Sequence, residues 1–98
     1  MVIVEKRYHR DLVKDMKRLD GRERVIVLNK IDAVANGSVR GAALSGTVDC
    51  FKLRIADLQL VYLIRGDEIW FLIIDRRGRV YEEFARRYLQ VLRGLENK

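Results

Sequence analysis

The sequence has no proline, one cysteine and one histidine among its 98 residues. A single cysteine excludes an intramolecular disulfide and a thiolate metal cluster, and a single histidine excludes catalysis by a histidine pair. Long apolar runs are also lacking, because the longest, Ile69–Ile74, falls far short of the ~20 residues of a membrane-spanning helix. Charges follow the first four residues, so we expect no signal peptide. These absences predict a cytoplasmic protein with no metal or other cofactor and no membrane contact.

Positive charge is in excess. Lys and Arg number 20 against 14 Asp and Glu, which gives a formal net charge of +6. Such an excess favours a polyanionic partner, above all RNA, although the alternative is a basic surface that serves solubility only. Hydrophobic residues make up 49% of the chain, which is typical of a folded domain, and the length predicts one domain over residues 1–98.

The first half of the chain has the pattern of a strand followed by two helices. Val2–Val4 predicts a short strand. Apolar residues then recur at three- and four-residue steps in two segments, the first from Tyr8 to the break at Asp20 and the second ending at Asn36. The buried positions expected are Leu12, Val13, Met16 and Leu19, then Val25, Leu28, Ile31 and Ala35. The short connection predicts an antiparallel helical hairpin.

The second half changes to a period of two. Residues 38–47 are glycine-rich and predict a loop, and alternating apolar residues then predict strands over Phe51–Ile55, Leu58–Arg65 and Glu68–Asp75. Helical spacing returns from Tyr81 to Leu95. Helices segregated from an antiparallel sheet give the α+β class. The last two strands are apolar on both faces, so the C-terminal helix or a partner protein must cover the second face, and the helix is the favoured cover.

Two groups of cations carry the candidate chemistry. Lys52 and Arg54 point to the same face of one strand, about 7 Å apart, and an anion between them would relieve their repulsion. Alone, this pair would be an ordinary solvated strand face. Three arginines, however, follow the third strand just before Tyr81; they are Arg76, Arg77 and Arg79. Arginine binds phosphate in a bidentate manner and tyrosine stacks on bases, so the pattern predicts an RNA-binding groove.

Cleavage of RNA by its own 2′-hydroxyl needs a base, cations for the charged phosphorane and an acid for the departing 5′-oxygen. With neither a histidine pair nor a carboxylate cluster in the sequence, Lys, Arg and Tyr must supply these groups. A lysine flanked by arginines is a candidate base, because neighbouring positive charge favours its neutral form. Arginines stabilise the developing negative charge.

The order of motifs from Leu44 to Tyr81 resembles the C-terminal half of the RelE/ParE superfamily of bacterial toxins. The segment has a Leu-x-Gly turn at 44–46, a strand with alternate basic residues, Leu-Val-Tyr at 60–62, a hydrophobic strand and Arg-x-x-Val-Tyr at 77–81. The upstream helices agree with the same layout. The resemblance implies a RelE-like toxin of a type II toxin–antitoxin pair that cuts messenger RNA on the ribosome without metal. Its partner would be a cognate antitoxin that masks the groove, in a heterotetramer or a larger complex.

Carried over by position, the resemblance makes Lys52, Arg54, Arg77 and Tyr81 the catalytic residues. Lys52 or Tyr81 would activate the 2′-hydroxyl, whereas Arg54 and Arg77 would stabilise the phosphorane. Tyr81 would also stack on a base. The expected RNA-binding residues are Gln59, Arg76 and Arg79.

Gln59 departs from the resemblance, because RelE-type ribonucleases usually have an arginine at this place. Either Arg76 or Arg79 substitutes for it, or activity is weakened. A further alternative is the ParE branch, which inhibits DNA gyrase, and another is a non-catalytic nucleic-acid-binding module on the same fold.

The remaining chemically distinctive residues have ordinary interpretations. His9 is expected on the surface of the first helix, and Cys50 is expected to be a small buried residue. Trp70 and Phe71 are expected in the core.

Overall fold

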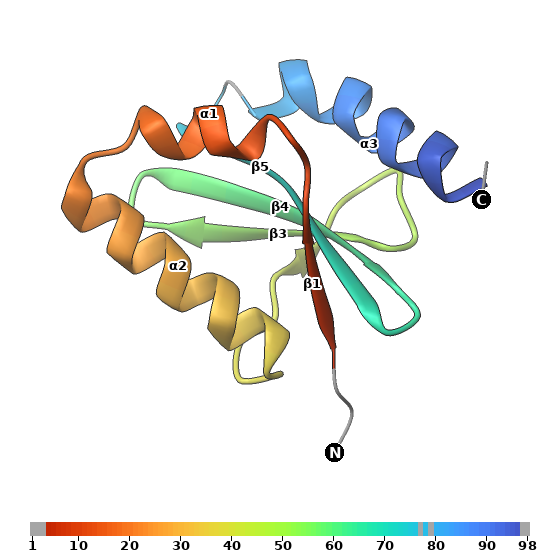
Figure 1. Cartoon of the computed structure of the whole chain (residues 1–98), viewed down its shortest axis with the longest axis horizontal. Coiled ribbons are helices and arrows are strands. Elements are labelled where there is room, and N and C mark those ends of the chain that lie inside the picture. Colours follow the sequence, from red (N-terminus) through yellow and green to blue (C-terminus); the bar gives the residue numbers. More distant parts are fainter. Residues whose placement is uncertain (1–3, 77, 79, 97–98) are drawn as a thin grey trace.

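The computed structural model describes residues 4–76, 78 and 80–96 (Figure 1). In chain order its elements are β1 (Glu5–Tyr8), α1 (Leu12–Lys17), α2 (Gly21–Ala35), β2 (Ala42–Ala43), β3 (Cys50–Ile55), β4 (Leu58–Arg65), β5 (Glu68–Arg76) and α3 (Val80–Glu96). The expected α+β class is confirmed, and the three-stranded antiparallel meander lies where the period of two predicts it.

The sheet is wider than the predicted meander. Its order is β1-β5-β4-β3-β2, with β1 parallel to β5 and the other neighbours antiparallel. The first described strand is Glu5–Tyr8, which is extended because it pairs in parallel with β5 from Glu68 to Phe71. Of the predicted strand Val2–Val4, only Val4 lies within the described residues, and it precedes β1. The predicted loop contains β2, whose two residues are too few to show a period.

The first helix begins later than the sequence predicts. The backbone N–H of His9 still donates to Phe71 of β5 at 2.9 Å, so sheet pairing continues past Tyr8 and α1 starts only at Leu12. The predicted helical hairpin is present, because α1 and α2 are consecutive helices joined by the three residues 18–20. In Figure 1, α1 lies across the top of the sheet and α2 turns back from the end of α1 along the side of the sheet. The first helix packs on β5 and the second contacts β3.

The buried face of α2 also differs from the predicted stripe. Val27, Ile31 and Val34 are buried, whereas Val25 and Leu28 are 57% and 50% exposed. Both sets satisfy helical spacing, so the period alone could not choose between them. Glu23 lies in line with the buried set and pairs with Arg76 of β5 at 2.7 Å, which turns this face toward the sheet.

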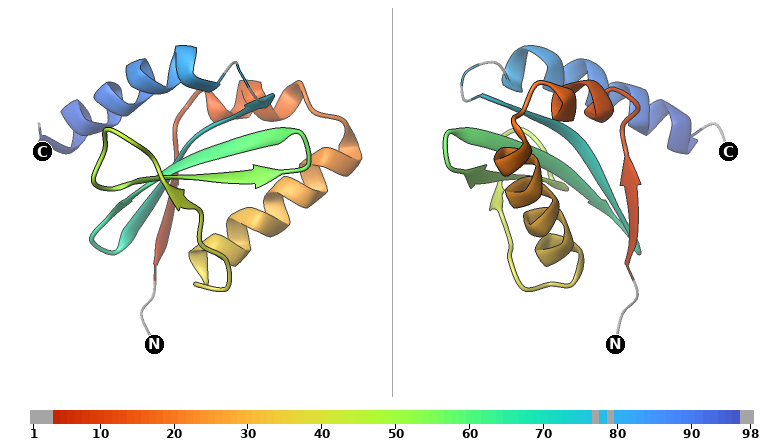
Figure 2. Two further views of the ribbon diagram at one scale, coloured as in Figure 1. Left: turned by 180° about the vertical axis from the view of Figure 1, so that it is seen from behind. Right: turned by 60° about the vertical axis from the view of Figure 1, so that its left-hand side comes forward.

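Each face of the sheet is covered by helices of this chain (Figure 2). The face toward α1 and α2 buries Leu60, Tyr62 and Phe71, and the opposite face buries Val61, Leu63 and Leu72 against α3. The expectation that the C-terminal helix covers the second face is therefore confirmed. Phe71 is fully buried as expected, but Trp70 is only half-buried, at the border of the α3 core.

A buried ion pair joins α1 to α3 across the edge of β5. Arg87 donates to both carboxylate oxygens of Asp15, at 2.6 and 3.1 Å, and to the Leu72 carbonyl at 2.9 Å. The backbone N–H of Ile74 donates to the same carboxylate at 3.2 Å. These bonds satisfy two backbone groups on the edge of β5 beyond the end of β1, the Leu72 carbonyl and the Ile74 N–H.

Cys50 is buried, as expected. Burial, with the nearby Asp49 carboxylate, raises the pKa of its thiol from 9.0 to about 12. We expect iodoacetamide at about pH 8 to leave Cys50 unmodified in the folded protein and to alkylate it after unfolding in urea, because only the thiolate reacts. Mass spectrometry measures the difference in alkylation between the two states, and equal modification in both would contradict the burial.

The raised pKa of Cys50 also means that the free energy of unfolding falls as pH rises from 9.0 toward 12, because the thiol loses its proton more readily in the unfolded chain.

Candidate nucleic-acid interface

Lys52 and Arg54 share one face of the sheet with Gln59. Arg54 lies directly opposite Gln59 on the neighbouring strand, and Lys52 lies opposite Val61. Directly opposite residues of antiparallel strands point to the same face, and Val61 belongs to the core on the α3 side. The three polar side chains therefore lie on that side, on the part of the sheet near β3.

These residues line a depression of about 370 Å³ at the edge formed by β2, β3 and β4. We call it the basic groove; its lining residues are Arg40, Gly41, Ala42, Lys52, Leu53, Arg54, Leu58 and Gln59. The lining has three cations and no carboxylate. An anion would meet attraction here without competition from an acidic side chain.

The cations of the basic groove are not neutralised by carboxylates of the described residues. Arg54 donates through Nε to the Ala56 carbonyl at 3.1 Å, and the Arg40 guanidinium lies 5.4 Å from the centroid of the Phe51 ring. No ion pair of the described residues involves Arg40, Lys52 or Arg54. Hydrogen bonding and stacking hold the two arginines without neutralising them.

Tyr81, in the first turn of α3, contacts Gln59 beside the basic groove. Gln59 donates through Nε2 to the Tyr81 hydroxyl at 3.2 Å. Gln59 is only 9% exposed, whereas Tyr81 is 47% exposed. The structure thus brings together four of the residues selected from the sequence, and it places the tyrosine where a bound strand could contact its ring.

The protein sequence matches no protein-family model and no curated protein significantly. Solved structures do match. A mutant of the E. coli toxin RelE in the free state has a TM-score of 0.73 and 18% identity, over 87% of this chain and 97% of that chain. This chain has the RelE fold.

Two RelE structures with their antitoxins agree with this result. The RelB-RelE complex of Methanococcus jannaschii has a TM-score of 0.65 and 20% identity, over 76% of this chain and 94% of that chain. The RelBE2 complex of Mycobacterium tuberculosis has a TM-score of 0.63 and 20% identity, over 80% and 95%. The resemblance drawn from the motifs is confirmed at the level of the fold.

Within the RelE fold of this chain, Arg76 does not lie in the basic groove. Its Nη1 lies 2.7 Å from Glu23 of α2 and 2.9 Å from Asp57. The hydrogen bond that Arg76 donates to Glu23 is the largest of the interactions that favour the charged form, and it raises the pKa of Arg76. Arg76 therefore does not substitute for an arginine at position 59, because it holds α2 against β5 instead. Arg77 and Arg79 lie outside the described residues, and their roles stay predictions.

Arg40 is the lining residue that sequence reasoning missed. It precedes β2 in a segment without periodicity, so nothing in the sequence indicated that it would lie beside β3. The pairing of Ala42 with Lys52 brings it there.

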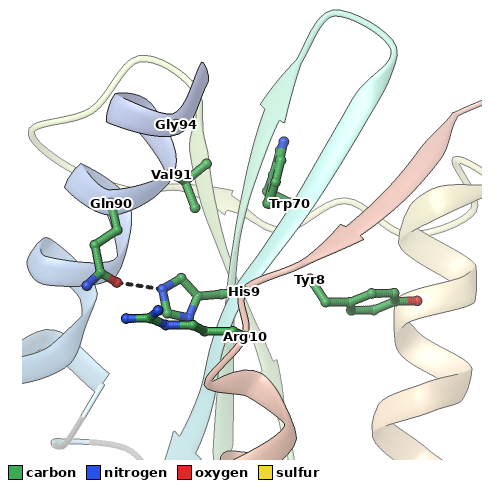
Figure 3. Close-up of a pocket in the computed structure, with 7 residues that line it drawn as sticks. All are labelled: Tyr8, His9, Arg10, Trp70, Gln90, Val91 and Gly94. Atoms are coloured by element: carbon green, nitrogen blue, oxygen red, sulfur yellow. Dashed lines mark hydrogen bonds between the residues drawn. The ribbon is translucent and has the colours of Figure 1, made fainter. Parts of the chain in front are cut away.

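A second hollow, of about 360 Å³, lies between β1, β5 and the end of α3 (Figure 3). At its base His9 is hydrogen-bonded through Nε2 to Gln90 at 2.7 Å and accepts the Asp11 backbone N–H at 3.0 Å. The expectation of a surface histidine was wrong, because His9 is on the link after β1 and α3 covers it. Arg10 is the one cation among its lining residues, so this hollow lacks the charge of the basic groove.

The described part of the chain gathers no group of three His, Cys, Asp or Glu side chains that could hold a metal ion. Within residues 4–76, 78 and 80–96, no helix is long and apolar enough to cross a membrane.

Proposed function

We propose that this protein is the toxin of a type II toxin–antitoxin pair, and that it is a metal-independent, ribosome-dependent endoribonuclease that inhibits translation. The observation that carries the proposal is the basic groove, in which Lys52 and Arg54 have no acidic partner and Tyr81 is close by through Gln59. The RelE fold supports the same function, since the neighbours named above are RelE toxins.

The proposed reaction uses only side chains and the RNA itself. The 2′-oxygen attacks the adjacent phosphorus while Lys52, acting as the base, takes its proton. Arg54, with Arg77 as the resemblance implies, neutralises the charge that develops on the phosphorane. The bond to the 5′-oxygen then breaks, and this oxygen takes the proton of Tyr81. The products are a 2′,3′-cyclic phosphate and a free 5′-hydroxyl.

Tyr81 suits the role of acid better than that of base. Its oxygen accepts the Gln59 amide N–H, so its own proton remains available for donation. Lys52 is left as the base.

A cognate antitoxin is the proposed partner in the cytoplasm, besides the ribosome and messenger RNA, in a heterotetramer or a larger complex. Three of the matched structures are complexes of RelE with RelB, and a fourth is RelE with a peptide of RelB. Val13, Val25 and Leu28 on α1 and α2 are 50–58% exposed, and a wrapping partner would remove this apolar surface from water.

Inhibition of DNA gyrase is the second candidate. Gln59 favours it, because a neutral side chain stands where the resemblance places an arginine of the nuclease. A non-catalytic RNA-binding module remains the third.

Induced expression in bacteria, with the 5′-ends of messenger RNA mapped, tests the proposal. The native protein is expected to arrest growth and to cut within translated frames. Lys52→Ala/Arg54→Ala is expected to lower cleavage by about 100-fold, since it removes the base and a stabilising charge. Lys17→Ala/Arg24→Ala removes the same charge from exposed positions on α1 and α2, and should leave cleavage unchanged.

The other outcomes separate the alternatives. Growth arrest with intact messages and an induced DNA-damage response would contradict the nuclease and indicate gyrase. Growth without arrest would indicate the binding module.

A further inference from the structure

The hydrogen bond between Gln59 and Tyr81 leaves the Tyr81 O–H donor and the Gln59 Oε1 acceptor unused. Gln59 donates its Nε2 hydrogen to the tyrosine oxygen at 3.2 Å, so the Tyr81 hydroxyl retains its own proton. The other amide atom, Gln59 Oε1, accepts no hydrogen bond from the described residues. Among the described residues, the only buried side-chain atom without a hydrogen-bond partner is Arg87 Nε. Gln59 Oε1 also has no partner, so it is not buried, and it is accessible from the basic groove that Gln59 lines.

The position of this pair is fixed by the sheet. Gln59 is the second residue of β4, between Arg54 of β3 and Asp75 of β5, and it is 9% exposed. A side chain held between two paired strands loses little further freedom on binding. The pair therefore offers a preorganised donor beside a preorganised acceptor, next to the cations Lys52 and Arg54.

We propose that Gln59 selects RNA over DNA by accepting a hydrogen bond from a ribose 2′-hydroxyl other than the attacking one, while Tyr81 donates to an oxygen of the phosphate on the 5′ side of that ribose. This inference rests on the proposed function, in that the basic groove must bind a nucleic acid. In RNA each phosphate has a neighbouring 2′-hydroxyl, which is the donor that Gln59 Oε1 lacks. DNA has the phosphate acceptor but no such donor.

Glutamine is the side chain that this role requires. An arginine at position 59 has donors only, so it could bind the phosphate of either nucleic acid but could not accept from a hydroxyl. The neutral amide gives up one positive charge and gains an acceptor. On this argument Gln59 is a specificity-determining residue of this chain rather than a lost arginine.

Binding of two labelled decanucleotides, one RNA and one DNA, tests the inference. Both contain only A, C and G in the same order, so they differ in the 2′-hydroxyl alone, and a gel after each titration verifies that the RNA is intact. The native protein should bind the RNA about tenfold more tightly, because one well-placed hydrogen bond is worth about this factor. Gln59→Met keeps the length of the side chain and should lower the affinity for RNA to nearly that for DNA.

Two further variants sharpen the result. Gln59→Arg should bind both oligonucleotides more tightly while losing the preference for RNA. Lys52→Ala/Arg54→Ala should weaken both equally and lower the slope of log affinity against log salt by about 1.4, at about 0.7 for each lost phosphate contact. Circular dichroism confirms that each variant is folded, and the two substitutions at position 59 test the same preference independently.

The outcomes for the two claims differ. Equal affinity of the native protein for RNA and DNA, or an undiminished preference in both Gln59→Met and Gln59→Arg, would overturn the role of Gln59 and leave nucleic-acid binding intact. A native protein that binds neither oligonucleotide would overturn this inference together with nucleic-acid binding by the basic groove.

Discussion

Replacement of Arg87 by methionine is expected to lower the free energy of unfolding by about 3–5 kcal/mol. Arg87 is 4% exposed and its partner Asp15 is 1% exposed. Methionine fills much of the same space, but it leaves the Asp15 carboxylate buried without the two hydrogen bonds that Arg87 donates. It also removes the donor to the Leu72 carbonyl at the edge of β5. The large cost comes from the uncompensated charge rather than from the lost attraction alone.

Urea denaturation measures this effect, with Arg86→Met as the matched control. Arg86 is the neighbouring residue on α3, its side chain is 47% exposed, and it pairs with Asp11 and Glu83 at the surface. Its replacement should shift the urea midpoint little, since exposed ion pairs contribute little. The double variant Asp15→Leu/Arg87→Met should recover much of the loss, because no buried charge remains. A midpoint for Arg87→Met equal to that of the control would refute the argument.

The same ion pair shows where sequence reasoning stops. Asp15 and Arg87 are 72 positions apart, each in a helix whose charged residues are expected to face water. Their burial follows from the arrangement of α1 and α3 on either side of the β5 edge, which no local pattern encodes. The first half of the fold is poorly predictable for the same reason, since β1 gains its strand conformation by parallel pairing with β5, about sixty residues downstream.

The meander was predictable because its signals are local. Alternating residues and two tight turns define β3, β4 and β5, and strand alternation alone places Lys52 and Arg54 on one face. The contact between Gln59 and Tyr81 was not, because it joins β4 to α3 across 22 positions of sequence and so depends on how the helix packs on the sheet. Arg76 shows the opposite case. Its position in the sequence predicted a place in the basic groove, but its ion pairs with Glu23 and Asp57 hold it outside the groove.

Replacement of Gly41 by alanine is expected to destabilise the protein by about 2–3 kcal/mol. A Cβ at this position would lie 2.4 Å from the Lys52 carbonyl oxygen and 2.9 Å from its carbon. These are backbone atoms of β3, so β2 must move away from β3. The movement would break the hydrogen bond that the Gly41 N–H donates to the Tyr62 hydroxyl at 2.7 Å, and Tyr62 is fully buried. A buried hydroxyl without this partner adds to the cost.

Thermal unfolding compares this variant with Gly94→Ala, which adds the same methyl group on α3. Apart from its own chain neighbours and the helix backbone, no atom of the described residues lies within 4 Å of a Cβ at Gly94, so that change should stabilise the helix by about 0.5–1 kcal/mol. The two substitutions should therefore move the unfolding temperature in opposite directions. Because Gly41 borders the basic groove beside Lys52, Gly41→Ala should also weaken RNA binding below its unfolding temperature, whereas Gly94→Ala should not. A stable Gly41→Ala variant with native RNA affinity would show that the contact between β2 and β3 neither supports the fold nor shapes the groove.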